Sequence, residues 1–146
     1  MTEAVQSLKD FPVQVKITLA KEEMRGDSHV KNICYIQYFE NARIQYIQSI
    51  GLDELKSAGI GQILAQSVCN YRKPLVYPDQ ITVGAKLKSL GKSSFVIEYI
   101  IVSDKIGIAA DGEEVIVIYD YNHSRKTELP AIIKEGIEKL EGNNFR

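Results

Sequence analysis

The stretch from His29 to Gly51 constrains the fold of this chain more than any other. It reads HVKNICYIQYFENARIQYIQSIG, and its apolar residues recur at helical spacing, which predicts a single long helix. One stripe of that helix carries four isoleucines, Ile33, Ile36, Ile44 and Ile47. Aromatic residues widen the apolar surface well beyond half of the circumference, and a helix of that kind is usually buried inside a larger structure.

Glu40 falls on the same stripe, between Ile36 and Ile44. Burying an unpaired carboxylate is costly, so Glu40 is the first candidate for a functional residue. The alternative is an ordinary helix ion pair with Arg43, three residues further on, which is worth only about 0.2–0.5 kcal/mol on a helix surface.

Around this helix the chain alternates between strand-like and turn-like segments. Short turns between consecutive β segments favour antiparallel pairing. We therefore predict an α+β fold, a curved antiparallel sheet wrapped around one long central helix, with a C-terminal helix. Strands are predicted over 13–19, 62–71, 81–87, 95–102 and 108–121, the last with a bulge or local turn at 111–112, and the final helix over 129–140.

The totals describe one ordinary globular domain. We expect it to span residues 13–141, after a loose N-terminal segment (1–12) and before a short tail (142–146). Lys plus Arg (18) nearly balances Asp plus Glu (19), which argues against nucleic acid as a partner, and no apolar run is long enough for a membrane helix. The two cysteines, Cys34 and Cys69, lack metal-ligand spacing, so we expect no metal site and a cytoplasmic location with reduced thiols.

Three segments together resemble one family. HVKNICYIQYFENAR, YRKPLVYPDQITV and GKSSFVIEY are similar to the hotdog-fold acyl-CoA thioesterases of the 4-hydroxybenzoyl-CoA thioesterase type, whose members commonly read DxDxxGHVNNxxYxxYFExAR at the first place. The resemblance spans residues 13–140. It implies a hotdog fold and a homodimer or homotetramer with active sites at the subunit interface. It also implies hydrolysis of an acyl-CoA or acyl-carrier thioester without metal or bound cofactor, coenzyme A being part of the substrate.

The chain departs from this pattern in the loop before the helix. The second acidic position of the family, the usual base or nucleophile, is Arg25, while the first is Glu23. Ser28 replaces the glycine before the histidine, and Lys31 replaces the first asparagine, whereas Asn32 matches the second. The resemblance therefore predicts the scaffold more firmly than the catalytic acid.

Thioester hydrolysis needs donors for the carbonyl oxygen and a base or nucleophile beside the carbonyl carbon. A helix N-terminus supplies donors through its unpaired N–H groups and its dipole. The resemblance places the carbonyl near Asn32, Ile33 and Cys34, so Asn32 and Ile33 are predicted to bind substrate. Asn32 could equally cap the helix, and core packing is the favoured reading of Cys34.

Four residues are candidates for the acid–base half of the reaction: Glu40, Asp27, Glu23 and His29. Each has a structural alternative, which is an ion pair for Glu40, a helix N-cap for Asp27, a solvated loop charge for Glu23 and loop anchoring for His29. Arg25 either faces the substrate as an electrophile or points to solvent.

Arg72 and Lys73 lie beside the Tyr-x-x-Pro turn, where they could meet the phosphates of coenzyme A or form a solvated pair. His123 is expected at the surface. Because of Arg25, a non-hydrolytic hotdog module that binds an acyl thioester or serves as an assembly partner stays the alternative to an enzyme. A hotdog dehydratase or hydratase is a weaker third reading, since those proteins generally begin the helix with another pattern.

Overall fold

A single antiparallel sheet forms the body of the protein. The computed structural model describes residues 7–142, so the first half of the predicted loose segment (1–6) and most of the predicted tail (143–146) lie outside the described residues. The strands follow the order β1-β5-β6-β7-β4, and the short β8 adds to β7. Their bounds are Val13–Thr18 (β1), Ile60–Tyr71 (β4), Gln80–Leu90 (β5), Ser94–Ser103 (β6), Gly107–Asp120 (β7) and Arg125–Lys126 (β8).

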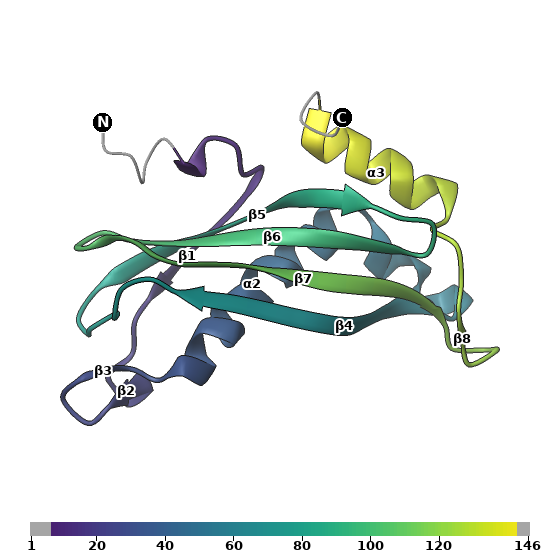
Figure 1. Cartoon of the computed structure of the whole chain (residues 1–146). Coiled ribbons are helices and arrows are strands. Elements are labelled where there is room, and N and C mark those ends of the chain that lie inside the picture. The colour runs from purple at the N-terminus through teal and green to yellow at the C-terminus, as the bar shows by residue number, and fades with distance from the viewer. Residues whose placement is uncertain (1–6, 143–146) are drawn as a thin grey trace.

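The long helix α2, Asn32–Ser49, lies across one face of this sheet (Figure 1). A 3-10 segment η2, Leu52–Ala58, leads from it to β4, and the C-terminal helix α3, Ala131–Glu141, packs beside β5. Another 3-10 turn η1, Lys21–Glu23, and a small hairpin of β2, Met24–Arg25, and β3, His29–Val30, precede α2. The predicted α+β arrangement, a sheet curled around one central helix with a C-terminal helix, is confirmed.

The helix begins at Asn32, one of the residues at which the sequence allows a helix start. Val30 donates its N–H to the Leu75 carbonyl and Lys31 donates to the Glu23 carbonyl, so the backbone stays extended through Lys31. The predicted irregularity at 111–112 is wrong, because β7 runs straight through Gly112. A Cβ atom on Gly112 would lie 2.1 Å from the Val68 carbonyl oxygen, which shows that this glycine allows close approach rather than a turn.

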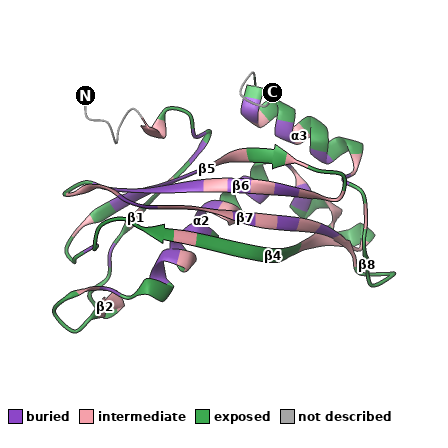
Figure 2. Cartoon of the chain, viewed as in Figure 1, coloured by how far each residue is buried: buried purple, intermediate pink, exposed green. Residues whose placement is uncertain are grey.

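The rotation of α2 about its own axis differs from the prediction. The isoleucine stripe was expected to be buried, yet Ile33 is 65% exposed and Ile44 is 51% exposed, while Ile47 is buried. Figure 2 shows that α2 carries both buried and exposed residues. The sheet is instead covered by the aromatic side of the helix, with Tyr35, Tyr38, Phe39, Ala42 and Tyr46 all buried. Phe39 stacks on Tyr99 of β6 with ring centroids 4.6 Å apart.

The opposite face of the sheet carries a second, smaller apolar cluster. Phe11 packs there against Ile100 and Val102, with Leu8 and Ile108 at its margin. Residues 7–12, which belong to the segment predicted to be loose, therefore include a buried anchor on the outer face.

No helix within residues 7–142 is long and apolar enough to cross a membrane. Across the same range, no three His, Cys, Asp or Glu side chains are grouped so that they could hold a metal ion.

Candidate active site

A pocket of about 200 Å³ opens where β3 passes into α2 and where β4 ends. Long-range pairing brings these ends together, because Val30 is bonded to Leu75 just after β4. Four predicted site residues meet in this pocket. Its lining consists of His29, Asn32, Tyr35, Tyr71, Arg72, Lys73 and Pro74.

The N-terminus of α2 offers unpaired donors to this pocket. Its N-cap residue, Lys31, is extended and makes no side-chain cap, and the first turn holds no acidic residue. Cys34 donates its N–H to the Lys31 carbonyl at 3.0 Å, whereas the N–H groups of Asn32 and Ile33 have no acceptor among the described residues. Two backbone donors at the positive end of an 18-residue helix dipole are thus free to bind an oxyanion.

Two tyrosines that were predicted only as apolar bulk frame the pocket. The Tyr35 hydroxyl donates to the Lys73 carbonyl at 3.4 Å and accepts the Leu75 N–H at 3.1 Å. Tyr71 meets the Tyr35 ring edge-on at 5.0 Å, and its hydroxyl donates to the Asn32 carbonyl at 3.4 Å. Burial raises the pKa of Tyr35, so it stays a neutral donor. Only the Tyr-x-x-Pro spacing hinted at this frame.

Glu23 is more firmly held than a solvated loop charge. It is half-buried in η1, its carboxylate accepts the Ala20 N–H at 2.7 Å, and its carbonyl accepts the Lys31 N–H just before α2. The Tyr38 hydroxyl is buried without a regular hydrogen bond among the described residues. Burial first, and then the charge of nearby Glu23, raise the pKa of Tyr38. Glu23 is therefore the acidic candidate whose carboxylate lies beside the helix.

The hairpin before the helix places Arg25 and Asp27 at the surface. Both are exposed, and Arg25 pairs with His29 across the β2–β3 ladder. Asp27 does not cap the helix, because the helix begins at Asn32. His29 is half-buried, with Nδ1 at 3.0 Å from the Val30 carbonyl oxygen, and it lines the pocket as predicted.

Glu40 is not the buried carboxylate that the sequence suggested. Its side chain is 57% exposed and lies 3.4 Å from Arg43. The buried carboxylate is Glu114 on β7, which accepts hydrogen bonds of 2.7 Å from Arg43, Ser67 and Tyr99. Strand alternation places Glu114 on the same face as buried Ile116, and this signal in the sequence could have identified it.

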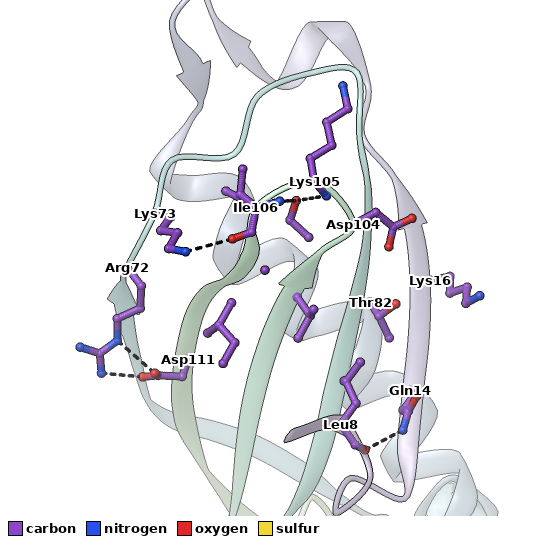
Figure 3. Close-up of a pocket in the computed structure, with 14 residues that line it drawn as sticks. Leu8, Gln14, Lys16, Arg72, Lys73, Thr82, Asp104, Lys105, Ile106 and Asp111 are labelled. Carbon is purple, nitrogen blue, oxygen red and sulfur yellow. Dashed lines mark hydrogen bonds and ion pairs between the residues drawn. The ribbon is translucent and has the colours of Figure 1, made fainter. Parts of the chain in front are cut away.

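Arg72 and Lys73 reach from the pocket into a larger groove of about 910 Å³ on the outer face (Figure 3). Arg72 binds both carboxylate oxygens of Asp111, at 3.0 and 3.1 Å, and Lys73 donates to the Ile106 carbonyl at 3.1 Å. Burial raises the pKa of Asp111, but hydrogen bonds from Arg72 and Asn70 outweigh it and leave this pKa lowered. The Asp111 carboxylate therefore holds the Arg72 guanidinium in one orientation.

Two other residues behave as their structural readings predicted. Cys34 is buried, and burial together with Glu23 raises the pKa of its thiol, which removes the case for an activated nucleophile. His123 is exposed and paired with Asp120 at 2.7 Å, far along the chain from the pocket.

Known proteins match this chain over most of its length. The family model of the thioesterase-like superfamily matches residues 26–137. The crystal structure of a thioesterase from Thermus thermophilus, complexed with coenzyme A and Zn, is 31% identical, covers 92% of this chain and 98% of its own, and superposes with a TM-score of 0.80. The long-chain acyl-CoA thioesterase FadM of Escherichia coli is 25% identical over 130 residues, covering 88% of this chain and 98% of FadM.

The DHNA-CoA thioesterase from Staphylococcus aureus, at 20% identity, shares the fold with a TM-score of 0.80 over 90% of this chain and 92% of its own. The predicted hotdog fold and thioesterase class are confirmed by these matches. The chain belongs to the thioesterase-like superfamily.

Proposed function

We propose that the protein hydrolyses acyl-CoA thioesters and that the backbone N–H groups of Asn32 and Ile33 bind the carbonyl oxygen. The unpaired helix start carries this proposal, since Asn32 lines the pocket and Ile33 follows it in the first turn. Water adds to the carbonyl carbon, negative charge develops on the carbonyl oxygen, and collapse breaks the C–S bond to give the acid and the thiol of coenzyme A. Preorganised donors at such an oxygen stabilise the transition state more than the substrate.

The base that activates water is assigned to Glu40 of a second subunit. Glu40 follows Asn32 by eight residues, which is about 12 Å along a helix. It therefore cannot serve the pocket at the start of its own helix. A twofold axis that sets two α2 helices antiparallel would bring the exposed Glu40 of each toward the N-terminus of the other.

Exposed apolar surface supports a homodimer built in this way. Strand β4 is 12 residues long, pairs with β7 on one side and has no described strand on the other. Long unpaired edges are ready to pair with another chain. Exposed apolar side chains flank this edge on β4 and on α2, namely Ile63, Leu64, Val68, Ile33 and Ile44. Antiparallel pairing of β4 with its own copy would cover them.

The proposal includes a place for coenzyme A. Arg72 and Lys73 line both the pocket and the outer groove, so a thioester held at Asn32 could extend its phosphates toward them. Guanidinium and ammonium groups are the usual partners of phosphate. Backbone donors and a carboxylate together require no resident cofactor, and the two free cysteines fit a reducing cytoplasmic location.

Asn32→Pro tests the carbonyl site directly. Proline is tolerated at the first helical position, and Lys31 already has the extended ψ of 142° that a residue before proline adopts. The substitution removes one donor, and we expect kcat/KM to fall about 10²–10³-fold, as for other oxyanion donors. Asn32→Ala is the matched control, because it removes the side chain and keeps the N–H. Equal losses in both variants would contradict a role for the N–H.

Arg25, which stands at the position of the family's usual catalytic acid, favours one second candidate, a module that binds acyl thioesters without hydrolysing them. Release of coenzyme A from short, aromatic and long acyl-CoA substrates separates the two. Binding of these substrates without any thiol release above buffer would replace the enzyme by the binding module.

A further inference from the structure

A second pocket, of about 400 Å³, lies at the opposite end of β4 from the candidate active site. Leu52 of η2, Ile60 and Gly61 of β4, and Tyr121 after β7 form much of its wall. The Tyr121 hydroxyl donates to the Gln62 carbonyl at 3.3 Å, and its ring lies so close to Gly61 that a Cβ atom there would be 2.9 Å away. None of the residues assigned to the proposed hydrolysis lines this pocket.

Within one chain the two pockets are far apart. The second pocket is bounded by Ile60–Gln62 and the candidate active site by Tyr71–Lys73. From Ile60 to Tyr71 is 11 residue steps, which span about 37 Å in an extended strand. No ligand of ordinary size bridges them in a monomer.

Antiparallel pairing of β4 with its own copy would bring the second pocket of one subunit close to the Asn32 pocket of the other. When a strand pairs antiparallel with its own copy over its whole length, its first residue lies opposite the last residue of the copy. Ile60 of one subunit would then lie across from Tyr71 of the other, at the strand spacing of about 4.8 Å. Each second pocket would thereby adjoin the Asn32 pocket of the other subunit.

We infer that this second pocket receives the acyl chain of a thioester whose carbonyl is bound by the partner subunit, and that Tyr121 sets the accepted chain length. The inference rests on the proposed thioester hydrolysis and names the specificity determinant of that site. Leu52, Ile60 and the ring of Tyr121 provide an apolar surface, and the glycine at position 61 allows the Tyr121 ring to pack against the strand backbone. Asp53 and Lys56 also line the pocket, and because their charges are opposite they add no net charge to it.

Tyr121 is suited to act as the end wall. It is 55% exposed in the single chain, and its ring contacts Tyr119 edge-on at 5.0 Å, so its removal would leave the neighbouring wall in place. Truncation would lengthen the pocket, whereas a larger ring would shorten it. One methylene in an apolar site changes kcat/KM about 10–200-fold, which makes chain length a sensitive readout.

The first experiment measures kcat/KM on saturated acyl-CoA substrates of increasing length. Tyr121→Ala should shift the ratio of long to short chains upward by about tenfold or more, and Tyr121→Trp should shift it downward. Ile132→Ala, at an exposed position of α3, is the control and should keep the wild-type profile. Unchanged profiles in both Tyr121 variants would overturn the inference.

Mixed dimers then test whether the pocket serves the partner. In the first mixed dimer, one subunit carries Tyr121→Ala and the other carries Asn32→Pro. The only functional carbonyl site is then in the Tyr121→Ala subunit and faces the intact Tyr121 of the other, so the chain-length profile should be that of the wild type. With both changes in one subunit, the profile should shift to longer chains. The opposite pair of results would overturn the assignment to the partner. Full activity of an Asn32→Pro homodimer would instead reject the carbonyl site, while the homodimer profiles of the Tyr121 variants would still decide the acyl pocket.

Discussion

The two sides of α2 show how one helix can carry stability on one side and proposed function on the other. The inner side places Tyr38, Phe39 and Tyr46 against the sheet with almost no exposure, whereas the outer side leaves Ile33 and Ile44 in solvent. The outer side also carries Gln37, Asn41 and Gln45, so its two isoleucines are apolar residues on a mainly polar surface. What differs is the partner, which is the sheet on the inner side and, as proposed, a second subunit on the outer side.

Arg43 lies at the boundary between these sides and contacts a carboxylate on each. Glu114 is fully buried and has three hydrogen-bond donors, while Glu40 is exposed and, within residues 7–142, has only the long contact to Arg43. Removing an acceptor from a dry network leaves its donors unsatisfied, but water replaces a lost contact at the surface. The same residue type should therefore matter for folding at one position and only for chemistry at the other.

The largest loss in the free energy of unfolding is expected from Phe39→Ala, on the inner side of α2. Phe39 is fully buried and stacked on Tyr99, and truncating a buried phenylalanine costs about 3–5 kcal/mol. Urea unfolding of wild type and variant at equal protein concentration measures the loss. A loss below about 1 kcal/mol would show that the aromatic side does not form the core.

Next in size is Glu114→Ala, for which we expect a loss of about 3 kcal/mol, because Arg43 loses its buried counter-charge. Glu40→Ala is the matched control and should cost less than about 0.5 kcal/mol. Replacing both charges, by Arg43→Met with Glu114→Leu, should recover the part of the loss due to the unpaired Arg43 charge, while the donors of Ser67 and Tyr99 stay unsatisfied. Similar losses of stability in Glu40→Ala and Glu114→Ala would show that the burial of Glu114 does not make it more important for folding than Glu40.

A smaller effect on folding, but a large one on assembly, is expected from Ile44→Lys. The residue is exposed in the single chain, so the fold should persist, while a charge placed in the proposed interface should weaken the dimer. Light scattering measures the mass, and circular dichroism measures the fold. Ile132→Lys, on exposed α3 surface, should leave the mass unchanged. A dimer that survives Ile44→Lys would exclude the outer side of α2 from the interface.

The smallest effect concerns the Arg72–Asp111 pair on the outer face of the sheet. The folded-state pKa of Asp111 is lowered, so the pair contributes stability above the unfolded pKa of about 3.9, and this contribution is lost as pH falls through the folded-state pKa. Because both groups are partly exposed, screening keeps it below about 1 kcal/mol. The stability difference between wild type and Asp111→Asn should shrink toward zero on acidification. If the stability difference grew on acidification instead, the folded-state pKa of Asp111 would be raised rather than lowered.

The strands and the long helix followed from periodicity alone. The alternating run predicted over 81–87 is found as Gln80–Leu90, and the run predicted over 95–102 is found as Ser94–Ser103. The rotation of α2 did not follow from the isoleucine stripe, although the polar strip of Gln37, Asn41, Gln45 and Gln48 does lie on the exposed side. Glu114 was missed since its neighbour Glu113 makes the pair look like a charged turn, although only Glu114 points inward.

The candidate site was predictable where the backbone supplies the chemistry. The structure brings Asn32 at the helix start together with His29, Arg72 and Lys73 in one pocket, while their roles in binding and catalysis stay predictions. The frame of Tyr35 and Tyr71 depends on contacts between residues about 40 positions apart, and no local pattern encodes such contacts.

The position of Glu141 has a consequence for biosynthesis. This buried carboxylate, in the last turn of α3, accepts both the Tyr46 hydroxyl of α2 at 2.8 Å and the Leu87 N–H of β5 at 3.0 Å. Chains emerge from the ribosome in sequence order, so α2 and every strand are made before their acceptor exists. Until α3 leaves the exit tunnel, the middle of the domain has two unsatisfied donors and an uncovered apolar flank. The core is therefore completed only after α3 has been made and Glu141 has met its donors on α2 and β5.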